Sequence, residues 1–492
     1  MILYPIVFIL FLFLLIRYWK VFQLEGLSAW NLPVAFLIKF GVGLLLILIH
    51  IETYGVDELS HDGETFMKEG KLLHDVFFRS PADYFKLLTG LGETQELINK
   101  HLHMTEYWDS GDLTIINDSK NVIRAHSIIH FFSGNSLFIH LGLMCFISTI
   151  AFRNIFISFE RYIDQNRTVL FWLLLLIPST IFWTSSILKE PFMFLGLSFV
   201  ARAAFLEVSI QKRIIYSIIA CFLLLLYKPY ILVCVLLASI AVIVYNRVFK
   251  QRFALTIITL VGLTLTGAYF LDKPRERVVH YLSRKQFDFV NVGKGGLHVI
   301  SDTCYYYFQP HQYKYLFIEG NKVILLKETD AYIIKFGSIE KPIPVHLKPE
   351  NKIWTSVYNA PGCASYIETT MIMDSPEQLI RNIPEALVNA LIRPFPNDPG
   401  SKLKFLAVIE TWLILGFLII AIFYRRTLKV EQRTMIFALG IFSLLLLLLI
   451  GWTTPVLGAI ARYRFPAQLA LILIGLIILK PLKIKEWKSS SL

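Results

Sequence analysis

The chain has 492 residues, a formal net charge of +12 and a mean hydropathy of +0.58. Hydrophobic residues make up 55% of it and form long unbroken blocks, which excludes the alternating patterns of a soluble multidomain protein. The positive charge does not indicate a nucleic-acid partner, because the Lys and Arg residues stand in short clusters between the apolar blocks.

These apolar blocks predict membrane-spanning helices, each of which needs roughly 20 mostly apolar residues. The blocks are Ile2–Ile16, Pro33–His50, Ser133–Phe152, Thr168–Phe182, Pro191–Leu206, Ile214–Tyr227, Ile231–Tyr245, Phe253–Leu271, Leu403–Phe423, Met435–Ile450 and Pro466–Ile478. We therefore expect an all-α polytopic membrane protein with about 11 transmembrane helices. No basic n-region opens the first block and no small-residue cleavage site follows it, so we expect it to be retained.

Basic residues follow every odd-numbered block, which predicts that those connections are cytoplasmic. The clusters are Arg17 and Lys20; Arg153, Arg161 and Arg167; Lys212 and Arg213; Arg247, Lys250 and Arg252; Arg425, Arg426 and Arg433; and Lys480, Lys483, Lys485 and Lys488. The amino terminus is then outside and the carboxyl terminus inside.

The first outer loop, Ile51–Phe132, carries an acidic cluster where a membrane helix should surface. Asp57, Glu58, Asp62 and Glu64 lie within eight positions, with His61 among them. Such a cluster is costly at that depth unless it faces water, a cation or a substrate. A carboxylate here could act as a general base, and in the alternative Asp62 only caps a helix.

A helical face begins at this carboxylate. Asp62, Phe66, Gly70 and Leu73 are four, four and three residues apart, so on a helix they share one side. The amphipathic pieces of this loop are expected to lie on the membrane surface.

Two lysines fall in short outer connections, where the orientation rule disfavours them. Lys189 follows the Trp183–Leu188 turn and precedes Glu190, and Lys228 precedes Pro229. Each could hold a phosphate as a point charge, or could simply snorkel to the interface.

The long outer loop 272–402 predicts a small α+β extracytoplasmic domain. Tyr-, Val- and Ile-rich runs separated by Gly and Pro suggest strands, and Ser375-Pro376-Glu377 opens a helix. Cys304 and Cys363 lie in this loop and could pair in an oxidising compartment, although their spacing does not decide it.

Arginines on the predicted outer face form the sharpest basic signal. Arg462 and Arg464 directly precede the last block, and Arg393 lies near Phe395. Guanidinium binds phosphate in a bidentate manner, so a lipid-linked phosphate would explain them. The alternative is pairing with the acidic first loop.

The remaining motif search is negative or open. His61, His126 and His130 do not have a convincing metal spacing, and no Walker loop or dinucleotide fingerprint occurs. The acidic cluster permits a divalent metal but does not require one.

With these residues in view, the chain resembles the GT-C superfamily of glycosyltransferases, in particular the bacterial protein-mannosyltransferase-like and aminoarabinose-transferase-like branch. The resemblance rests on Asp62…Phe66…Gly70…Leu73, on Pro178–Trp183 with Lys189-Glu190, and on Gly458–Arg464 before a final helix. It covers most of the membrane part, and Phe66 stands where that branch has a tyrosine.

The resemblance implies an enzyme that takes a sugar from a polyprenyl-phosphate carrier, inverts the anomeric centre and passes the sugar to an extracytoplasmic lipid, glycan or protein. Asp62 would be the base, and Lys189, Arg462 and Arg464 would hold phosphate. The chain would then divide into a transmembrane region 1–271 with a catalytic loop 51–132, a loop domain 272–402 and a transmembrane region 403–492. It would reside in a bacterial inner membrane.

Two other functions fit the same pattern. A polymerase of lipid-linked polysaccharide repeat units also has many spans, a large outer loop and outward arginines, and it would depend on arginines such as Arg393 more than on Asp62. A transporter of lipid-linked sugar fits less well, since no inverted halves are visible.

Overall fold

A computed structural model of the chain describes residues 3–54, 61–103, 105, 107–108, 117–270, 272–301, 304–319, 322–335, 342–349, 353–360, 362–373 and 375–481. It is mostly helical, with one small antiparallel sheet. The chain forms two compact units that interleave along the sequence. Unit 1 comprises Met1–Ser239, Phe417–Leu439 and Leu469–Leu492, and unit 2 comprises Ile240–Gly416 and Gly440–Gln468.

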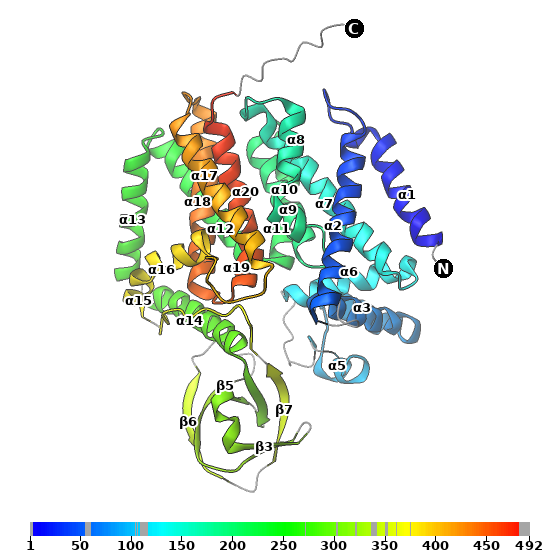
Figure 1. The fold of residues 1–492 in the computed structure, drawn as a ribbon, viewed down its shortest axis with the longest axis vertical. Coiled ribbons are helices and arrows are strands. Elements are labelled where there is room, and N and C mark those ends of the chain that lie inside the picture. Colours follow the sequence, from blue (N-terminus) through cyan, green and yellow to red (C-terminus); the bar gives the residue numbers. More distant parts are fainter. Residues whose placement is uncertain are drawn as a thin grey trace. The chain divides into compact units, whose positions relative to one another are not determined.

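The helices of the amino-terminal half belong to unit 1 (Figure 1). They are α1 (Leu3–Tyr18), α2 (Asn31–Tyr54), α3 (His61–Arg79), α4 (Pro81–Thr89), α5 (Gln95–His101), α6 (Asp118–Ser133), α7 (Leu137–Phe159), α8 (Arg167–Leu175), α9 (Pro178–Trp183), α10 (Glu190–Phe205) and α11 (Ile210–Tyr227), with short turns η1 (Lys20–Phe22) and η2 (Glu160–Tyr162).

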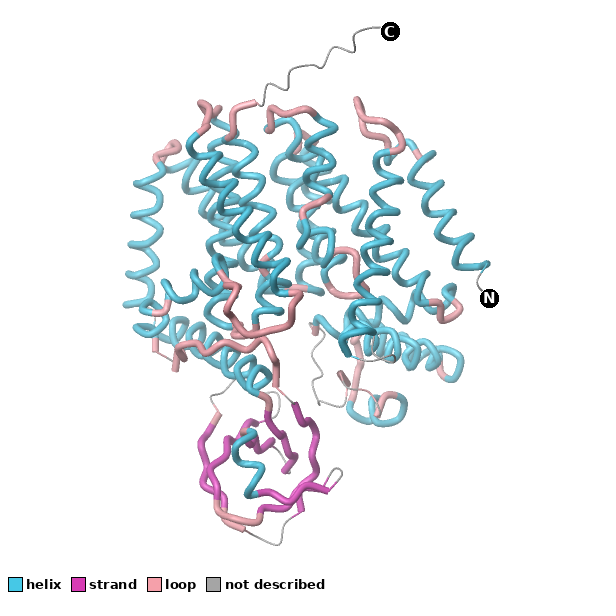
Figure 2. The backbone as a smooth tube through the Cα atoms, viewed as in Figure 1, coloured by secondary structure: helices cyan, strands magenta, loops and turns pink. Residues whose placement is uncertain are grey.

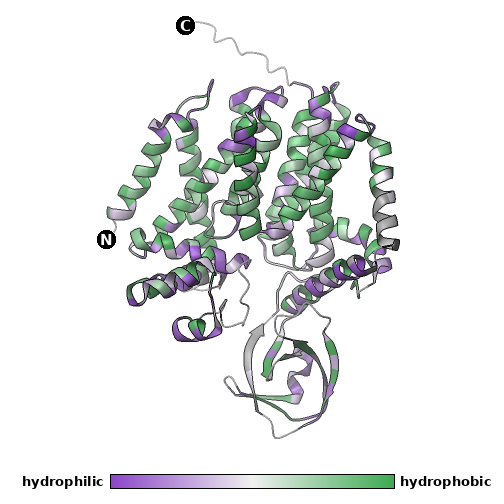
Figure 3. Ribbon diagram, turned by 180° about the vertical axis from the view of Figure 1, so that it is seen from behind, coloured by the Kyte–Doolittle hydropathy of each residue, from purple (hydrophilic) through white to green (hydrophobic). Residues whose placement is uncertain are grey.

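The later helices are α12 (Pro229–Ile243), α13 (Phe253–Phe270), α14 (Asp272–Lys294), α15 (Pro376–Arg381), α16 (Ile383–Leu387), α17 (Lys404–Phe423), α18 (Val430–Thr453), α19 (Leu457–Tyr463) and α20 (Phe465–Ile478), with the π-helical turns η3 (Val244–Val248) and η5 (Val388–Ile392). Figure 3 shows mostly apolar colour along many of these helices and a polar side on α3 and α14.

Six of the helices are long and apolar enough to cross a bilayer, so the chain is a membrane protein. They span Asn31–Glu52, Leu137–Tyr162, Ile210–Tyr227, Pro229–Val248, Lys404–Phe423 and Val430–Thr453. A seventh is reached if α19 and α20, bent by 52°, count as one span. The block Thr168–Phe182 is not one helix, because it breaks at Pro178 into α8 and α9.

The segments that follow the third, fifth, ninth and eleventh predicted blocks meet at one end of unit 1. Arg426 donates to the Tyr162 carbonyl at 2.8 Å, and Gln165 donates to the Lys480 carbonyl at 3.3 Å. Arg161 pairs with Glu207 at 3.0 Å. Connections on one side of a bilayer must converge in this way.

The long loop folds as one antiparallel sheet in unit 2 (Figure 2). Its strands are β1 (Gly296–Ser301), β2 (Cys304–Phe308), β3 (Leu316–Glu319), β4 (Lys322–Leu325), β5 (Thr329–Lys335), β6 (Ile343–Leu347) and β7 (Ile353–Ala360), in the order β3-β4-β7-β1-β2-β5-β6, with the turn η4 (Pro310–Tyr315) after β2. Alternate residues fill its core, among them Leu297, Val299, Val323 and Trp354. Cys304 and Cys363 are free thiols.

The described part of the first outer loop packs as α3–α6 around a buried apolar cluster that includes Phe66, Leu73, Val76 and Trp108, all without exposed surface. As the spacing predicts, α3 turns this face to α6. A β-carbon on Gly70 would lie 3.2 Å from the Ser127 nitrogen, so a glycine permits this close approach.

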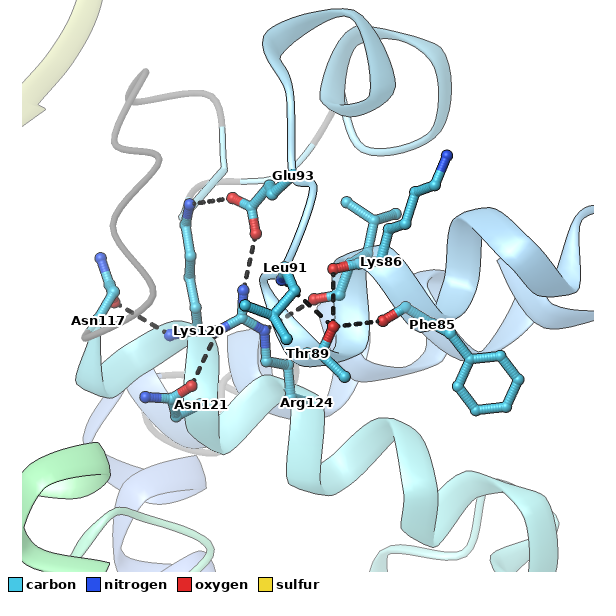
Figure 4. A network of polar contacts seen from close by, with 10 residues as sticks. Phe85, Lys86, Thr89, Leu91, Glu93, Asn117, Lys120, Asn121 and Arg124 are labelled. Atoms are coloured by element: carbon cyan, nitrogen blue, oxygen red, sulfur yellow. Dashed lines mark hydrogen bonds and ion pairs between the residues drawn. The ribbon is translucent and has the colours of Figure 1, made fainter. Parts of the chain in front are cut away.

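A buried ion network holds α6 to the segment before α5 (Figure 4). Both oxygens of Glu93 accept, one from Lys120 Nζ at 2.7 Å and the other from Arg124 Nη2 at 2.7 Å. Arg124 also donates to the Leu87 carbonyl at 2.8 Å and to Asn121 Oδ1 at 2.8 Å. Because all three charged side chains are nearly fully buried, each depends on the others for compensation.

Replacing Glu93 with Gln should therefore leave two buried cations uncompensated and destabilise the α3–α6 region by about 3–5 kcal/mol. Hydrogen exchange of α4–α6 amides in detergent measures the change, and Glu96→Gln, on the exposed side of α5, is the control. Equal protection in the two variants would contradict the role assigned to this network.

Candidate functional site

The candidate site lies in unit 1, where the start of α3, the start of α6, the segment before α10 and the α11–α12 junction come together. Asp62 is in the first turn of α3 and is partly buried. Phe66 follows one turn later on the same face and is fully buried.

Lys189 stands at the centre of this site. Its Nζ lies 2.9 Å from Asp118 Oδ1 and donates to Ser119 Oγ at 2.7 Å, both at the start of α6. The same Nζ lies 5.7 Å from the centre of the Phe66 ring, and Asp62 interacts with it electrostatically. The structure thus brings together two residues that the sequence singled out, Asp62 and Lys189, and adds Asp118.

Burial and the nearby charges have opposite effects on the pKa values of Asp118 and Lys189. Burial raises the pKa of the Asp118 carboxyl, but the Lys189 and Lys228 ammonium groups outweigh it and hold that pKa below its usual value. Burial lowers the pKa of Lys189, and Asp118 opposes that shift. The carboxylate form of Asp118 is therefore the favoured one at neutral pH.

Lys228 extends the site from the α11–α12 junction. Its Nζ lies 3.8 Å from Glu190 Oε1, and both side chains are almost fully buried. It also lies 5.7 Å from the centre of the Tyr230 ring. Two lysines and three carboxylates, Asp62, Asp118 and Glu190, thus gather at one end of unit 1.

A small, partly open cavity adjoins this cluster. It is lined by Gly43, Leu46, Ile47 and His50 of α2, by Gly63 of α3, and by Ser186, Ile187 and Leu188. The lining is largely apolar. It includes Gly63 and Leu188, which are the chain neighbours of Asp62 and Lys189. Such a surface can take a hydrocarbon segment whose polar end meets the charged residues.

The segment that carries Lys189 is held against α2. Lys39, buried in the middle of α2, donates to Thr184 Oγ1 at 2.7 Å and to Ser148 Oγ of α7 at 2.7 Å. One turn further, Gly43 has no side chain, and a β-carbon there would lie 2.4 Å from the Ser185 carbonyl oxygen. These two contacts fix Thr184 and Ser185 against α2, and Lys189 follows them in the chain.

The other acidic candidates differ in position. Glu64 lies two residues after Asp62 on α3 and forms an ion pair with Lys68. Asp57 and Glu58 lie outside the described residues.

The three arginine candidates belong to unit 2. Arg464 is 1% exposed and donates to the Ala390 and Arg393 carbonyls and, at 2.6 Å, to Thr411 Oγ1. Arg393 lies 3.5 Å from Asp398 and over the Phe395 ring. Arg462 is partly exposed in α19. The Arg464 guanidinium is thus committed to protein oxygens.

Asp118 is the residue that sequence reasoning missed. A signal was present, because Asn117 is a favoured capping residue and its side chain accepts from Ser119 and Lys120 at the start of α6. The Asn117 cap indicates a helix that begins at Asp118, but nothing in the sequence indicates that Asp118 lies beside Lys189.

No group of three or more His, Cys, Asp or Glu side chains able to hold a metal ion occurs among the described residues. Comparisons with protein families, with curated proteins and with solved structures find no match to this chain. The function must therefore be argued from the site itself.

The Asp118–Lys189 pair should make unfolding pH-dependent on the acid side. A carboxyl with a depressed folded pKa contributes stability above its unfolded pKa of about 4, and that stability is lost as the pH falls through the folded value. Asp118→Asn should lower the thermal unfolding midpoint at pH 6 and flatten its dependence below pH 4, as measured by tryptophan fluorescence in detergent. Asp164→Asn, a largely exposed carboxylate at the other end of unit 1, should retain that dependence.

Proposed function

We propose that this protein is an integral membrane glycosyltransferase that moves a sugar from a polyprenyl-phosphate carrier to an extracytoplasmic acceptor, which is a lipid, a glycan or a protein. The observation that supports it best is the position of Lys189, which lies over the Phe66 ring one turn after Asp62 and directly follows Leu188 in the lining of an apolar cavity in unit 1. A lipid-linked sugar needs these three elements: an apolar surface, a cation and a base.

In this proposal the isoprenoid end of the carrier occupies the cavity formed by α2, α3 and the 186–188 segment. The carrier phosphate meets Lys189, and Lys228 adds positive charge to the same end of unit 1. Lys189 has three donors, of which Asp118 and Ser119 use two among the described residues. A phosphate oxygen can take the third.

Asp62 is the general base of the proposed reaction. It removes a proton from the acceptor hydroxyl or amine while that group attacks the anomeric carbon, and the carrier phosphate leaves with inversion. The Lys189 ammonium stabilises the negative charge that develops on the phosphate.

We also propose that the chain belongs to the GT-C superfamily, has about 11 membrane spans and resides in a bacterial inner membrane. The apolar helices α1, α10 and α13, the pair α8 and α9, and the bent pair α19 and α20 would supply the crossings beyond the six long spans. The positions of Arg462 and Arg393 in unit 2 leave them as further candidates for binding a phosphate, whereas Arg464 is assigned a structural role.

Asp62→Asn should lower the transfer rate by about 10²–10⁴ if the carboxylate is the base, and Asp62→Glu should retain part of it. Cells that lack the gene are complemented with each variant, and the polyprenyl-phosphate-linked sugar in their membranes is measured by mass spectrometry. Accumulated unused donor is the expected result for Asp62→Asn. The control is Asp75→Asn, three turns further along α3, where the carboxylate is bound by Lys71 and His74.

The same experiment separates the polymerase. Normal transfer in Asp62→Asn, together with loss of all chain extension but an unaltered single-unit glycan in Arg462→Ala, would replace the transferase by a repeat-unit polymerase. Movement of unmodified lipid-linked sugar across proteoliposomes would instead indicate a transporter.

A further inference from the structure

A second polar site occurs in unit 1, on α7, α10 and α11. Arg153 lies on α7 and Arg202 on the neighbouring helix α10, where Arg202 donates to Asn154, the residue next to Arg153. Tyr216 of α11 lies against Arg202. The Arg202 guanidinium stacks over the Tyr216 ring at 4.4 Å and donates to its hydroxyl at 2.8 Å. Two like charges held together in a largely apolar region are unfavourable unless an anion compensates them.

The protein itself supplies no such anion. Among the described residues, Arg153 has no hydrogen bond or ion pair, and Arg202 is bound only by Asn154 Oδ1 at 3.1 Å and the Tyr216 hydroxyl. The Nε atoms of both arginines are buried without a hydrogen-bond partner. These donors are available to a ligand that the chain does not provide.

Neighbouring arginines show the contrast. At the same end of unit 1, Arg161 pairs with Glu207 at 3.0 Å and Arg426 pairs with Asp164 at 3.3 Å. Arg167 and Glu160 also form an ion pair. These three carboxylates are thus paired with other arginines, while Arg153 and Arg202 have no carboxylate partner among the described residues.

The local hydrogen bonds orient the Arg202 guanidinium. Asn154 donates through Nδ2 to Ser198 Oγ at 3.2 Å, and this turns its Oδ1 towards Arg202. Phe199 packs on Tyr216 with ring centres 5.7 Å apart. Residues of three helices therefore hold the Arg202 guanidinium in place before any ligand arrives, which lowers the entropic cost of binding.

We propose that Arg153 and Arg202 form an anion site that binds a phosphate group, with Tyr216 as a third donor or acceptor. Guanidinium matches the geometry of phosphate oxygens, and basic sites between membrane helices on the cytoplasmic side suit anionic lipid headgroups. The phosphate comes either from such a headgroup or from a soluble phosphate compound. The site is separate from the Asp62–Lys189 cluster, since Lys189 directly precedes α10 and Arg202 lies 13 residues further, roughly 20 Å along the helix.

Native mass spectrometry of the full chain in detergent tests this site. The probes are dioleoylphosphatidylglycerol, dioleoylphosphatidylcholine and, in a separate titration followed by thermal unfolding, inorganic phosphate. The wild type should bind the anionic lipid in preference to the zwitterionic one, and Arg153→Gln and Arg202→Gln should each weaken that binding by about tenfold or more.

The matched control is Arg161→Gln, which removes an arginine from the same end but one that already has a carboxylate partner. It should bind as the wild type does. Arg153→Lys and Arg202→Lys keep the charge and lose the planar fork, so they separate loss of phosphate recognition from loss of folding, and unfolding without ligand is measured for every variant.

Binding of phosphatidylglycerol that the Gln variants lose assigns the site to a lipid headgroup. Stabilisation by inorganic phosphate without lipid preference, lost in the same variants, assigns it to a soluble phosphate compound. Equal binding of both lipids by all folded variants and no effect of phosphate would overturn the anion site.

Discussion

Charge buried at the start of α6 is the constraint on which the rest of unit 1 depends. Within two turns this helix carries Asp118, Lys120 and Arg124, and the latter two are almost without exposed surface. Each must find an opposite charge, because an uncompensated buried ion costs several kcal/mol. Glu93 satisfies the two cations and Lys189 satisfies the anion, so the outer loop and the segment before α10 are fixed to the same helix end.

This arrangement makes one position serve two purposes. The contact that compensates Asp118 also fixes the Lys189 ammonium beside Asp62 and the apolar cavity. A cation free to move would have to be ordered when a substrate arrives, whereas one held by Asp118 and Ser119 is already placed. The same packing that stabilises the helix end thus prepares the proposed site.

The sequence predicts the local features of this site and not the distant pairings. The face formed by Asp62, Phe66 and Leu73 follows from helical spacing, which is a property of a few neighbouring residues. Lys189 is singled out because it violates the orientation rule. Its partner Asp118 lies 71 residues away and could not be found by spacing.

The orientation rule also has a limit, which the arginines at the end of α19 make plain. It identifies Arg464 as a cation in an unusual place, but it cannot say whether protein oxygens or a ligand surround the guanidinium. In the structure those oxygens come from Ala390, Arg393 and Thr411. The sequence does not give the number of spans for a similar reason. The composition of an apolar block such as Thr168–Phe182 does not reveal that the helix breaks at Pro178.

The two charged regions of unit 1 solve opposite problems. At the start of α6, cations and carboxylates are present in the chain in sufficient number, so the protein compensates itself and a ligand must share donors that are already oriented. On α7 and α10, Arg153 and Arg202 have only neutral oxygens and an aromatic ring within reach among the described residues. Neutral partners orient a guanidinium but do not neutralise its charge. An anion that binds there therefore gains electrostatic free energy from both guanidinium groups. A membrane whose lipids carry phosphate is the medium in which such an incomplete pair is stable.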